Sequence, residues 1–466
     1  MEIIIPFGDE RKIIQLDLPP GNVIIARGKN PSTTRTWSEV VGEDIRNPIG
    51  AEAINEQNLR GKQVVIIADD WGRPTPASEV MPLILDELQS TGVDDADITF
   101  ITASGMHDPM SKEDLARKLG REIVAKYQCI SHDGGNWDNL IFCGISPQGT
   151  PIWVNKYVAE ADYKIAIGRI YLHEAYGYEG GYKMIVPGVA SFDTIGRDHS
   201  FNFSADSIPG VHDNPSRREA DAIGKIVGID FLINVVVNSK GQPIKSFCGE
   251  PTIVHQMGIE YGDREVWGAE IQKKADIVVA SPGSGDVPKE GYHLETLYRA
   301  ARAAKESGTI ICVTAKEMVF EMKEGGAKAN KSLFGLNLQQ FQAALPSLAF
   351  SEILRLHEKR DWHLSEREIQ WRIKSLRGEF YRRRRIREIQ KRQVVLTPDP
   401  NVALQIVLAK TGSDLSACNG SSRRNFGTNA KPQADIRLVV LPEGKTTLPK
   451  EKLFHRNAKE MKIYEN

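Results

Sequence analysis

Apolar residues along this chain follow two alternating patterns. Three segments, 63–70, 97–104 and 163–170, are short and almost continuously apolar ("QVVIIADD", "DITFITAS" and "YKIAIGRI"), which is typical of parallel strands buried on both faces. Residues 77–91 instead have the i, i+3, i+4 spacing of an amphipathic helix, and another helix is expected near 111–127. The alternation of strands with helices predicts an α/β fold with mostly parallel sheets.

The same alternation resumes near residue 266, after an amino-terminal segment of a different kind. Residues 1–27 are expected to form a small antiparallel element, since two short apolar runs precede the turn signal "PPGN" and a third follows it. The later elements are a strand with a glycine-rich loop (275–285), a helix (292–306), a strand (309–315), a strand (393–400), a helix (401–410) and a strand (435–444).

These patterns set the expected domain limits. The 466 residues exceed one ordinary hydrophobic core. We expect an N-terminal α/β domain at 1–265 and a C-terminal α/β domain at 266–444, with a helical insert at about 336–392. Residues 412–433, rich in Ser, Gly and Asn, are expected to be a long loop, and 445–466 to be a charged tail.

Composition narrows the class of protein. The net charge of −1 provides no overall field that would attract nucleic acid or anionic lipid. Five cysteines without CxxC spacing indicate reduced thiols. The amino terminus has an acidic residue where a signal peptide is basic, and no apolar stretch approaches the roughly 18 residues of a membrane span. We therefore expect a cytoplasmic protein without a membrane partner.

Polar residues follow each of the three buried strands. Asp70 to Arg73, His107 and His173 all lie within a few residues of a strand end. Ligands of open α/β sheets bind outside the carboxyl ends of the strands, so these loops are expected to share one crevice. His107 and His173 could act there as paired acid and base, because imidazole titrates near neutral pH. His107, His173 and His199 lack the HExxH or CxxC spacing of a zinc site.

The segment "DDWGRPTP" (69–76) places Asp70 and Arg73 ahead of a helix start. Thr75 is expected to be the N-cap of that helix, with Pro76 at its first position. A guanidinium beside free backbone N–H groups could bind an anion. An ordinary turn with a capped helix is the alternative interpretation.

Lys183 lies in "GYEGGYKMIVPG" (177–188), a segment that has few bulky polar side chains. Gly180 and Gly181 precede it, and glycines let a backbone approach a ligand closely. A lysine placed in this way could form a covalent bond with a carbonyl-type group or hold a phosphate. The residues alone leave both options open, as well as a solvated lysine in a mobile loop.

Four segments, in this order, carry a resemblance: "DDWGRPTP", "SGMHDP", "RIYLHEAYGYEGGYKMIVPG" and "GRDHS". In order and spacing they resemble the signature segments of the nickel-dependent lactate racemase family of 2-hydroxyacid racemases and epimerases, over roughly residues 1 to 320. The resemblance implies an isomerase of two α/β domains with the active site in the cleft between them. It also implies a nickel-pincer nucleotide, the nickel complex of pyridinium-3,5-bisthiocarboxylic acid mononucleotide.

The resemblance implies a role for each matching residue. Lys183 would be the covalent tether of the cofactor, His199 the protein ligand to nickel, which suits imidazole, and His107 and His173 the acid–base pair. One histidine would take the hydroxyl proton while a hydride moves reversibly to the cofactor, and return of the hydride to the other face would invert the centre. The remaining cofactor contacts would come from the segment after the first strand, namely Asp70, Trp71, Gly72 and Arg73.

Several positions depart from the family pattern. The family generally has Tyr-Gln with a lysine three residues later, whereas this chain has Tyr298, Arg299 and Arg302. Gly72 stands where a threonine is usual, and the proline often found before His173 is missing. Tyr298, Arg299, Arg302 and Arg73 are expected to contact the substrate, and the added guanidinium predicts a larger or more acidic acid than lactate, such as malate, 2-hydroxyglutarate or a sugar acid.

Partners and alternatives complete the expectations. The implied partners are the small 2-hydroxy acid and the enzymes that synthesise the cofactor and insert nickel, and the sequence is compatible with an oligomer. The segment "YRRRRIREIQKR" has seven basic residues between 382 and 392, which could bind nucleic acid, although a solvated helix face is the interpretation we favour. A Schiff-base lyase acting through Lys183 is a third interpretation.

Overall fold

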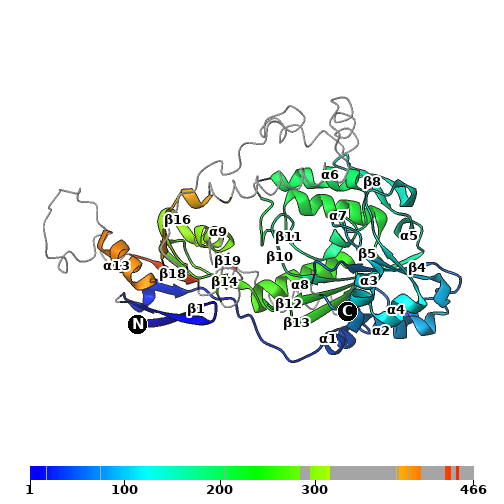
Figure 1. Ribbon diagram of the computed structural model, residues 1–466, viewed down its shortest axis with the longest axis horizontal. Coiled ribbons are helices and arrows are strands. Elements are labelled where there is room, and N and C mark those ends of the chain that lie inside the picture. Colours follow the sequence, from blue (N-terminus) through cyan, green and yellow to red (C-terminus); the bar gives the residue numbers. More distant parts are fainter. Residues whose placement is uncertain are drawn as a thin grey trace. The chain divides into compact units, whose positions relative to one another are not determined.

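The computed structural model describes residues 1–16, 18–73, 75–204, 206–283, 294–314, 385, 388–397, 399–410, 436–441 and 448–450. These residues form two compact units. The larger is built from Pro31–Gly262, and the smaller from Met1–Asn30 and the described residues from Asp263 onward. Both are α/β with mostly parallel strands, which confirms the expected fold class (Figure 1). The expected loop at 412–433 and most of the insert and tail lie outside the described residues.

The larger unit contains a six-stranded sheet of order β13-β12-β9-β4-β5-β6, in which only the edge strand β13 is antiparallel to its neighbour. Its strands are β4 (Val64–Asp69), β5 (Ile98–Ala103), β6 (Gln128–Ser131), β9 (Tyr163–Ile170), β12 (Phe231–Val237) and β13 (Pro243–Gly249). Two antiparallel pairs accompany the sheet, β7 (Leu140–Ile145) with β8 (Pro151–Asn155), and β10 (Leu172–His173) with β11 (Gly177–Tyr178).

Helices cover both faces of this sheet, which explains the unbroken apolar runs of its central strands. Val64, Ile66 and Ala68 of β4 belong to the core shared with the helices of one face, while Val65 and Ile67 are equally buried on the other. The first face carries α1 (Trp37–Asp44), α2 (Ala77–Leu88), α3 (Lys112–Leu119) and α4 (Arg121–Lys126). The remaining helices are α5 (Lys156–Ala159), α6 (Phe192–Ser200), α7 (Pro215–Val227) and α8 (Pro251–Glu265), with α6 and α7 along the top of this unit in Figure 1.

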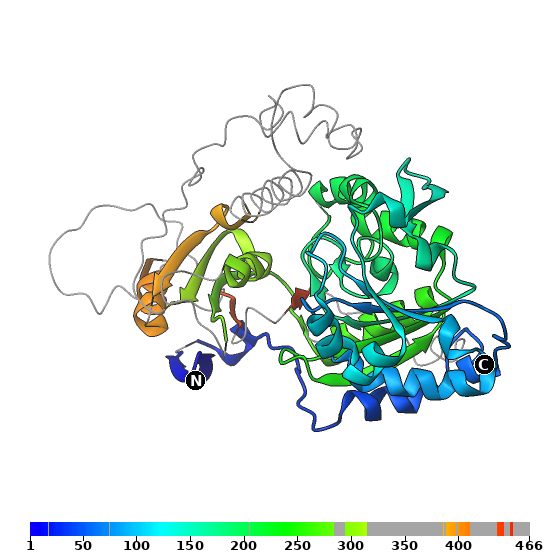
Figure 2. The ribbon, with the colours of Figure 1, turned by 45° about the vertical axis from the view of Figure 1, so that its right-hand side comes forward.

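The smaller unit has a fully parallel five-stranded sheet of order β17-β16-β15-β18-β3. The antiparallel hairpin of β1 (Glu2–Phe7) and β2 (Glu10–Gln15) lies beside α13 (Pro400–Lys410) (Figure 2), and the Asn401 side chain donates to Ile13 O at 2.6 Å. The other elements are β3 (Val23–Ile25), β14 (Gly268–Glu270), β15 (Ala275–Ala280), α9 (Leu294–Ala303), β16 (Ala304–Val313), β17 (Gln393–Thr397), β18 (Leu438–Leu441) and β19 (Leu448–Lys450).

The amino-terminal segment differs in part from the sequence expectation. The antiparallel pair of β1 and β2 is confirmed, but β3 pairs in parallel with β18 instead of extending that pair. This pairing groups Met1–Asn30 with the residues after Asp263, whereas the expected N-terminal domain began at residue 1. Strand pairing between distant segments leaves no local pattern, so the sequence could not indicate it.

The start of α2 also differs from the expectation. Pro76, not Thr75, is at the N-cap position, and no side chain caps the helix. The Thr75 hydroxyl instead donates to Asp69 Oδ2 at 2.6 Å. The helix expected near 111–127 is divided into α3 and α4 at Gly120, whose φ of +108° lies in the region that favours glycine. No helix among the described residues is both long and apolar enough to cross a membrane.

Candidate active site

The loops after β4, β5 and β9 meet at one edge of the six-stranded sheet. These three strands are adjacent and parallel, so their carboxyl ends point the same way. The Gly105 N–H, on the loop after β5, donates to Gly188 O at 2.9 Å and ties that loop to the segment that carries Lys183. The candidate residues that follow these three strands therefore come from neighbouring loops, although the sequence had not indicated the order of the strands.

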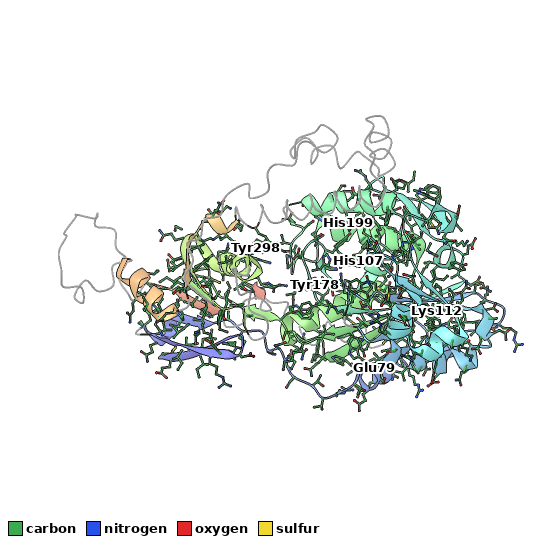
Figure 3. The ribbon with its side chains drawn as sticks, in the orientation of Figure 1. Glu79, His107, Lys112, Tyr178, His199 and Tyr298 are labelled. Carbon is green, nitrogen blue, oxygen red and sulfur yellow. The ribbon has the colours of Figure 1, made fainter. Side chains whose placement is uncertain are left out.

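Asp70 and His107 form a short pair between two of these loops. His107 Nδ1 lies 2.5 Å from Asp70 Oδ2, and Asp70 is buried while the His107 side chain is 37% exposed. A carboxylate only accepts hydrogen bonds, so this contact places the hydrogen of the neutral ring on Nδ1 and leaves the lone pair on Nε2. Figure 3 shows His107 in the same part of the larger unit as His199 and Tyr178.

The neighbouring carboxylate, Asp69, holds the loop after β4 indirectly, through Lys118 of α3. It pairs with the buried Lys118 of α3 at 2.6 Å, and the Lys118 Nζ also donates to the carbonyls of Thr75 at 2.7 Å and Arg73 at 3.1 Å. Burial raises the pKa of Asp69, against the opposing influence of Lys118 and Thr75. The first acid of the "DD" pair thus holds the backbone, and the second contacts His107.

Arg73 lies beside a carboxylate of the same unit. Its Nε is 3.0 Å from Glu179 Oε1, and the Arg169 Nε donates to the other oxygen, Oε2, at 2.6 Å. Glu179 therefore bridges two guanidinium groups and fixes the direction of Arg73. Trp71, two residues before Arg73, is 65% exposed.

The ring of Tyr176 brings together three of the residues expected to carry the chemistry. The Lys183 Nζ lies 3.8 Å from the ring centroid, the His173 ring is at 5.2 Å and the His199 ring at 6.1 Å, both edge-on. The Tyr176 hydroxyl donates to Asp198, the residue before His199 in α6. A single buried aromatic ring thus orients an amine and two imidazoles.

His173 is held differently from His107. Its Nδ1 accepts from the backbone N–H groups of Ala175 at 3.1 Å and Tyr176 at 3.2 Å. Backbone N–H groups can only donate, so the hydrogen of the neutral ring is on Nε2. Burial lowers the pKa of His173 well below its ordinary value, and the charges of Lys183 and Arg73 add to this.

The surroundings of Lys183 fit the implied tether. Formation of a covalent link to an acyl-type carbon requires a neutral amine. Burial lowers the pKa of Lys183 well below its ordinary value, and repulsion from Arg73 and Arg217 acts in the same direction, against Glu179 and Asp198. The donor set also includes the His199 imidazole, which suits nickel. Among the described residues, no group of three or more His, Cys, Asp or Glu side chains could hold a metal ion.

Arg217 of α7 holds the segment before Lys183 in place. Its buried guanidinium donates to the carbonyls of Tyr176 at 3.4 Å and Gly180 at 3.2 Å, and to that of Tyr178. It is 1% exposed. Sequence analysis did not single out Arg217, which lies 34 residues after Lys183 and matches no local motif, nor Tyr176, which lies within the quoted signature.

The glycines before Lys183 have a role that the sequence analysis did not indicate. Gly180 and Gly181 have φ of +81° and +64°, and a Cβ at Gly181 would lie 2.7 Å from His255 Nδ1. The Gly181 N–H donates to Asn234 Oδ1 at 3.0 Å, and His255 Nε2 bonds Glu179 O at 2.9 Å. These glycines let the turn pack against the protein's own buried polar groups.

The remaining candidates belong to the smaller unit. Tyr298, Arg299 and Arg302 all lie on α9, where Tyr298 and Arg299 are each 5% exposed. Their contact with substrate, and the cleft between domains, stay predictions.

The basic segment at 382–392 lies mostly outside the described residues. In its described part, Lys391 pairs with Glu306 at 3.1 Å and Arg392 with Glu388 at 2.6 Å. These two cations therefore have acidic partners within the protein.

Comparisons with known proteins point to one family. Residues 8–208 match the sequence profile described as "Lactate racemase N-terminal domain". The lactate racemase of Thermoanaerobacterium thermosaccharolyticum is 31% identical over 320 residues, which are 67% of this chain and 74% of the relative. The chain belongs to the lactate racemase family. The lactate racemase of Lactiplantibacillus plantarum is 32% identical over 280 residues, or 59% of this chain and 65% of that protein.

The solved structure of the lactate racemase apoprotein from T. thermosaccharolyticum has the same fold. It aligns with a TM-score of 0.65 and 24% sequence identity over 97% of this chain and all of that one. The resemblance inferred from four short segments is thereby confirmed at the level of the family, which is one of racemase-type isomerases. The roles of individual residues stay predictions.

Proposed function

We propose that this member of the lactate racemase family interconverts the stereoisomers of a 2-hydroxy acid with a nickel-pincer nucleotide bound covalently to Lys183. The observation that carries the proposal is the arrangement around Tyr176, where the Lys183 Nζ and the rings of His173 and His199 surround one buried ring. Family membership supplies the class of reaction and of cofactor.

The protein's own residues have distinct tasks in this proposal. When bound, the cofactor supplies a reversible acceptor for the hydride on C2 of the substrate. Lys183 holds that group, and His199 gives nickel an imidazole ligand. His107 and His173 contact the substrate oxygen, and Arg73 pairs with the substrate carboxylate, in a direction set by Glu179.

We further propose that the substrate is larger or more acidic than lactate. Support comes from Arg299 and Arg302, which stand where the family pattern has glutamine and lysine. A guanidinium binds a carboxylate through two parallel hydrogen bonds and carries a positive charge, whereas the glutamine amide is neutral. Malate and 2-hydroxyglutarate are the simplest acids that carry the required second carboxylate.

The test is a chiral assay of protein produced together with the cofactor-synthesis enzymes. Single enantiomers of lactate, malate and 2-hydroxyglutarate are incubated with the loaded protein and separated on a chiral column. We expect inversion of a dicarboxylic acid, its loss in Lys183→Ala, and its retention in Lys112→Ala, which removes an exposed lysine of α3. Absence of inversion of any 2-hydroxy acid, sugar acids included, would contradict the function, and a higher kcat/KM for lactate would contradict the substrate class.

The Schiff-base interpretation predicts a different result. A lyase that uses Lys183 would be trapped by borohydride in the presence of a keto acid and would need no metal. Trapping at Lys183 in protein produced without the cofactor enzymes, with cleavage of the acid, would favour that interpretation over a racemase.

A further inference from the structure

The two histidines that the sequence predicts as an interchangeable acid–base pair are held in opposite hydrogen-bonding states. We propose that His107 alone takes and returns the hydroxyl proton, whereas His173 acts as a neutral hydrogen-bond donor to the substrate oxygen. This division of roles rests on the proposed function and assigns each ring its own task.

The evidence for His107 is its contact with Asp70. A buried carboxylate 2.5 Å from Nδ1 fixes the ring with its hydrogen on Nδ1, so that the Nε2 lone pair can accept a proton. After that transfer the imidazolium remains paired with Asp70, which stabilises its positive charge. Asp70 is therefore a positioning residue for the base.

The evidence for His173 is the pair of backbone N–H groups that donate to its Nδ1. A proton can enter this ring at Nδ1 only if the N–H groups of Ala175 and Tyr176 lose their acceptor, and removal of the hydrogen from Nε2 would leave an anionic ring. The guanidinium groups of Arg73 and Arg217 repel a further positive charge there. A neutral N–H at Nε2 is the state that these surroundings favour, and such a donor polarises a carbonyl without transferring its proton.

One histidine is sufficient for the balance of protons. When the 2-hydroxy acid is oxidised, the O–H proton moves to His107 Nε2 and the C2 hydrogen leaves with two electrons to the bound hydride acceptor. When the hydride returns to the other face of the 2-keto acid, the new alkoxide takes the same proton back from His107. No second acid is consumed.

The first test needs no cofactor. Protein labelled with ¹⁵N in its histidines is titrated by long-range ¹H–¹⁵N correlation, with each ring assigned by substitution. We expect the neutral ring of His107 to carry its hydrogen on Nδ1, and His173 to remain in the neutral Nε2–H form well below the ordinary pKa of imidazole. Asp70→Asn should change which ring nitrogen of His107 carries the hydrogen. Asp108→Asn removes the same charge from the exposed residue that follows His107 and should leave the position of that hydrogen unchanged. A His173 ring that is protonated at neutral pH would overturn the proposal.

The second test uses protein loaded with the cofactor and replaces each histidine by glutamine, which keeps an N–H donor. A glutamine side chain can present an N–H near the position of Nε2 but cannot act as a base. We expect His173→Gln to lower kcat/KM by about 10- to 30-fold, and His107→Gln by about 10³-fold or more. Equal losses of 10³-fold would overturn the division of roles while leaving the racemase function intact. If the loaded protein inverts no acid, the proposed function fails and the titration alone still decides the states of the two rings.

Discussion

Two loops at the same edge of the sheet are built in different ways. The β9 turn (residues 171–188), which carries His173 and Lys183, is mostly buried, and its Tyr176 is 1% exposed. In the β4 loop (residues 70–73) Asp70 is buried, but Trp71 is 65% exposed. Glycines show the same contrast, because a Cβ at Gly181 would lie 2.7 Å from His255, whereas at Gly72 the nearest atom is Asp70 Oδ1 at 3.3 Å.

The difference separates the part of the site that must be rigid from the part that can vary. A covalent tether and a caged imidazole require fixed positions, and the β9 turn is fixed by Arg217, Asn234 and His255. In the β4 loop Trp71 and Gly72 are exposed, and one of the departures from the family pattern, Gly72, lies there. We expect substitutions in the turn to affect stability and those at Trp71 and Gly72 to affect substrate choice.

The largest effect is expected from Arg217→Met. Three carbonyls of the β9 turn would lose a buried donor, and the free energy of unfolding should fall by about 3–5 kcal/mol. Arg218→Met, the matched control, removes a guanidinium that is 55% exposed and should change it by less than about 0.5 kcal/mol. Urea unfolding measures both, and equal effects would show that the turn does not depend on Arg217.

A smaller loss is expected from Gly181→Ala. The new Cβ would meet His255 Nδ1 at 2.7 Å in a backbone with φ of +64°, which we expect to cost about 3 kcal/mol. Gly61→Ala has nearly the same φ, +68°, but nothing within 4 Å, so it should cost only about 1 kcal/mol. The difference between the two unfolding free energies isolates the clash, and a difference near zero would mean that the turn can move away from His255.

Acid should weaken the packing next to the β9 turn. Burial lowers the pKa of His132 to about 4, and its Nε2 bonds Ala190 O at 2.8 Å. The pKa of His132 in the folded protein lies below its unfolded value of about 6.5. The contribution of neutral His132 to the free energy of unfolding is therefore fully present above pH 6.5 and is lost as the pH decreases toward 4. From pH 7 to 5 this residue should contribute a loss of about 2 kcal/mol. His132→Gln should remove that part of the slope, and an unchanged slope would contradict the assignment.

The smallest effect on stability is expected from Gly72→Thr, which restores the residue usual in the family. A Cβ at the exposed Gly72 would lie 3.3 Å from Asp70 Oδ1 and 3.6 Å from His107 Cε1, so the Asp70 carboxylate must shift slightly. We expect the unfolding free energy to change by less than about 1 kcal/mol. The ratio of kcat/KM values for malate and lactate should change instead. A large loss of stability with an unchanged ratio would reverse the roles assigned to the two loops.

The sequence indicated those features that depend on local patterns. The strand at 163–170 was predicted to the residue. Asp70, His107 and His173 were expected in one crevice because ligands of open α/β sheets bind outside the carboxyl ends of the strands. The order of the strands, with β9 and β5 on either side of β4, was not predicted. The hydroxyl of Thr75 bonds Asp69 instead of capping α2, since a buried carboxylate competes for it. The clamp by Arg217 and the grouping around Tyr176 depend on tertiary packing between separate elements, which no spacing along the chain encodes.

The most direct test of the central claim is peptide mass mapping of Lys183. Protein produced with the cofactor-synthesis enzymes is digested, and nickel is measured in the intact protein. We predict a cofactor-derived mass on the peptide that contains Lys183, about one nickel per chain, and loss of both in Lys183→Ala. Racemase activity in protein whose Lys183 peptide is entirely unmodified would contradict the account.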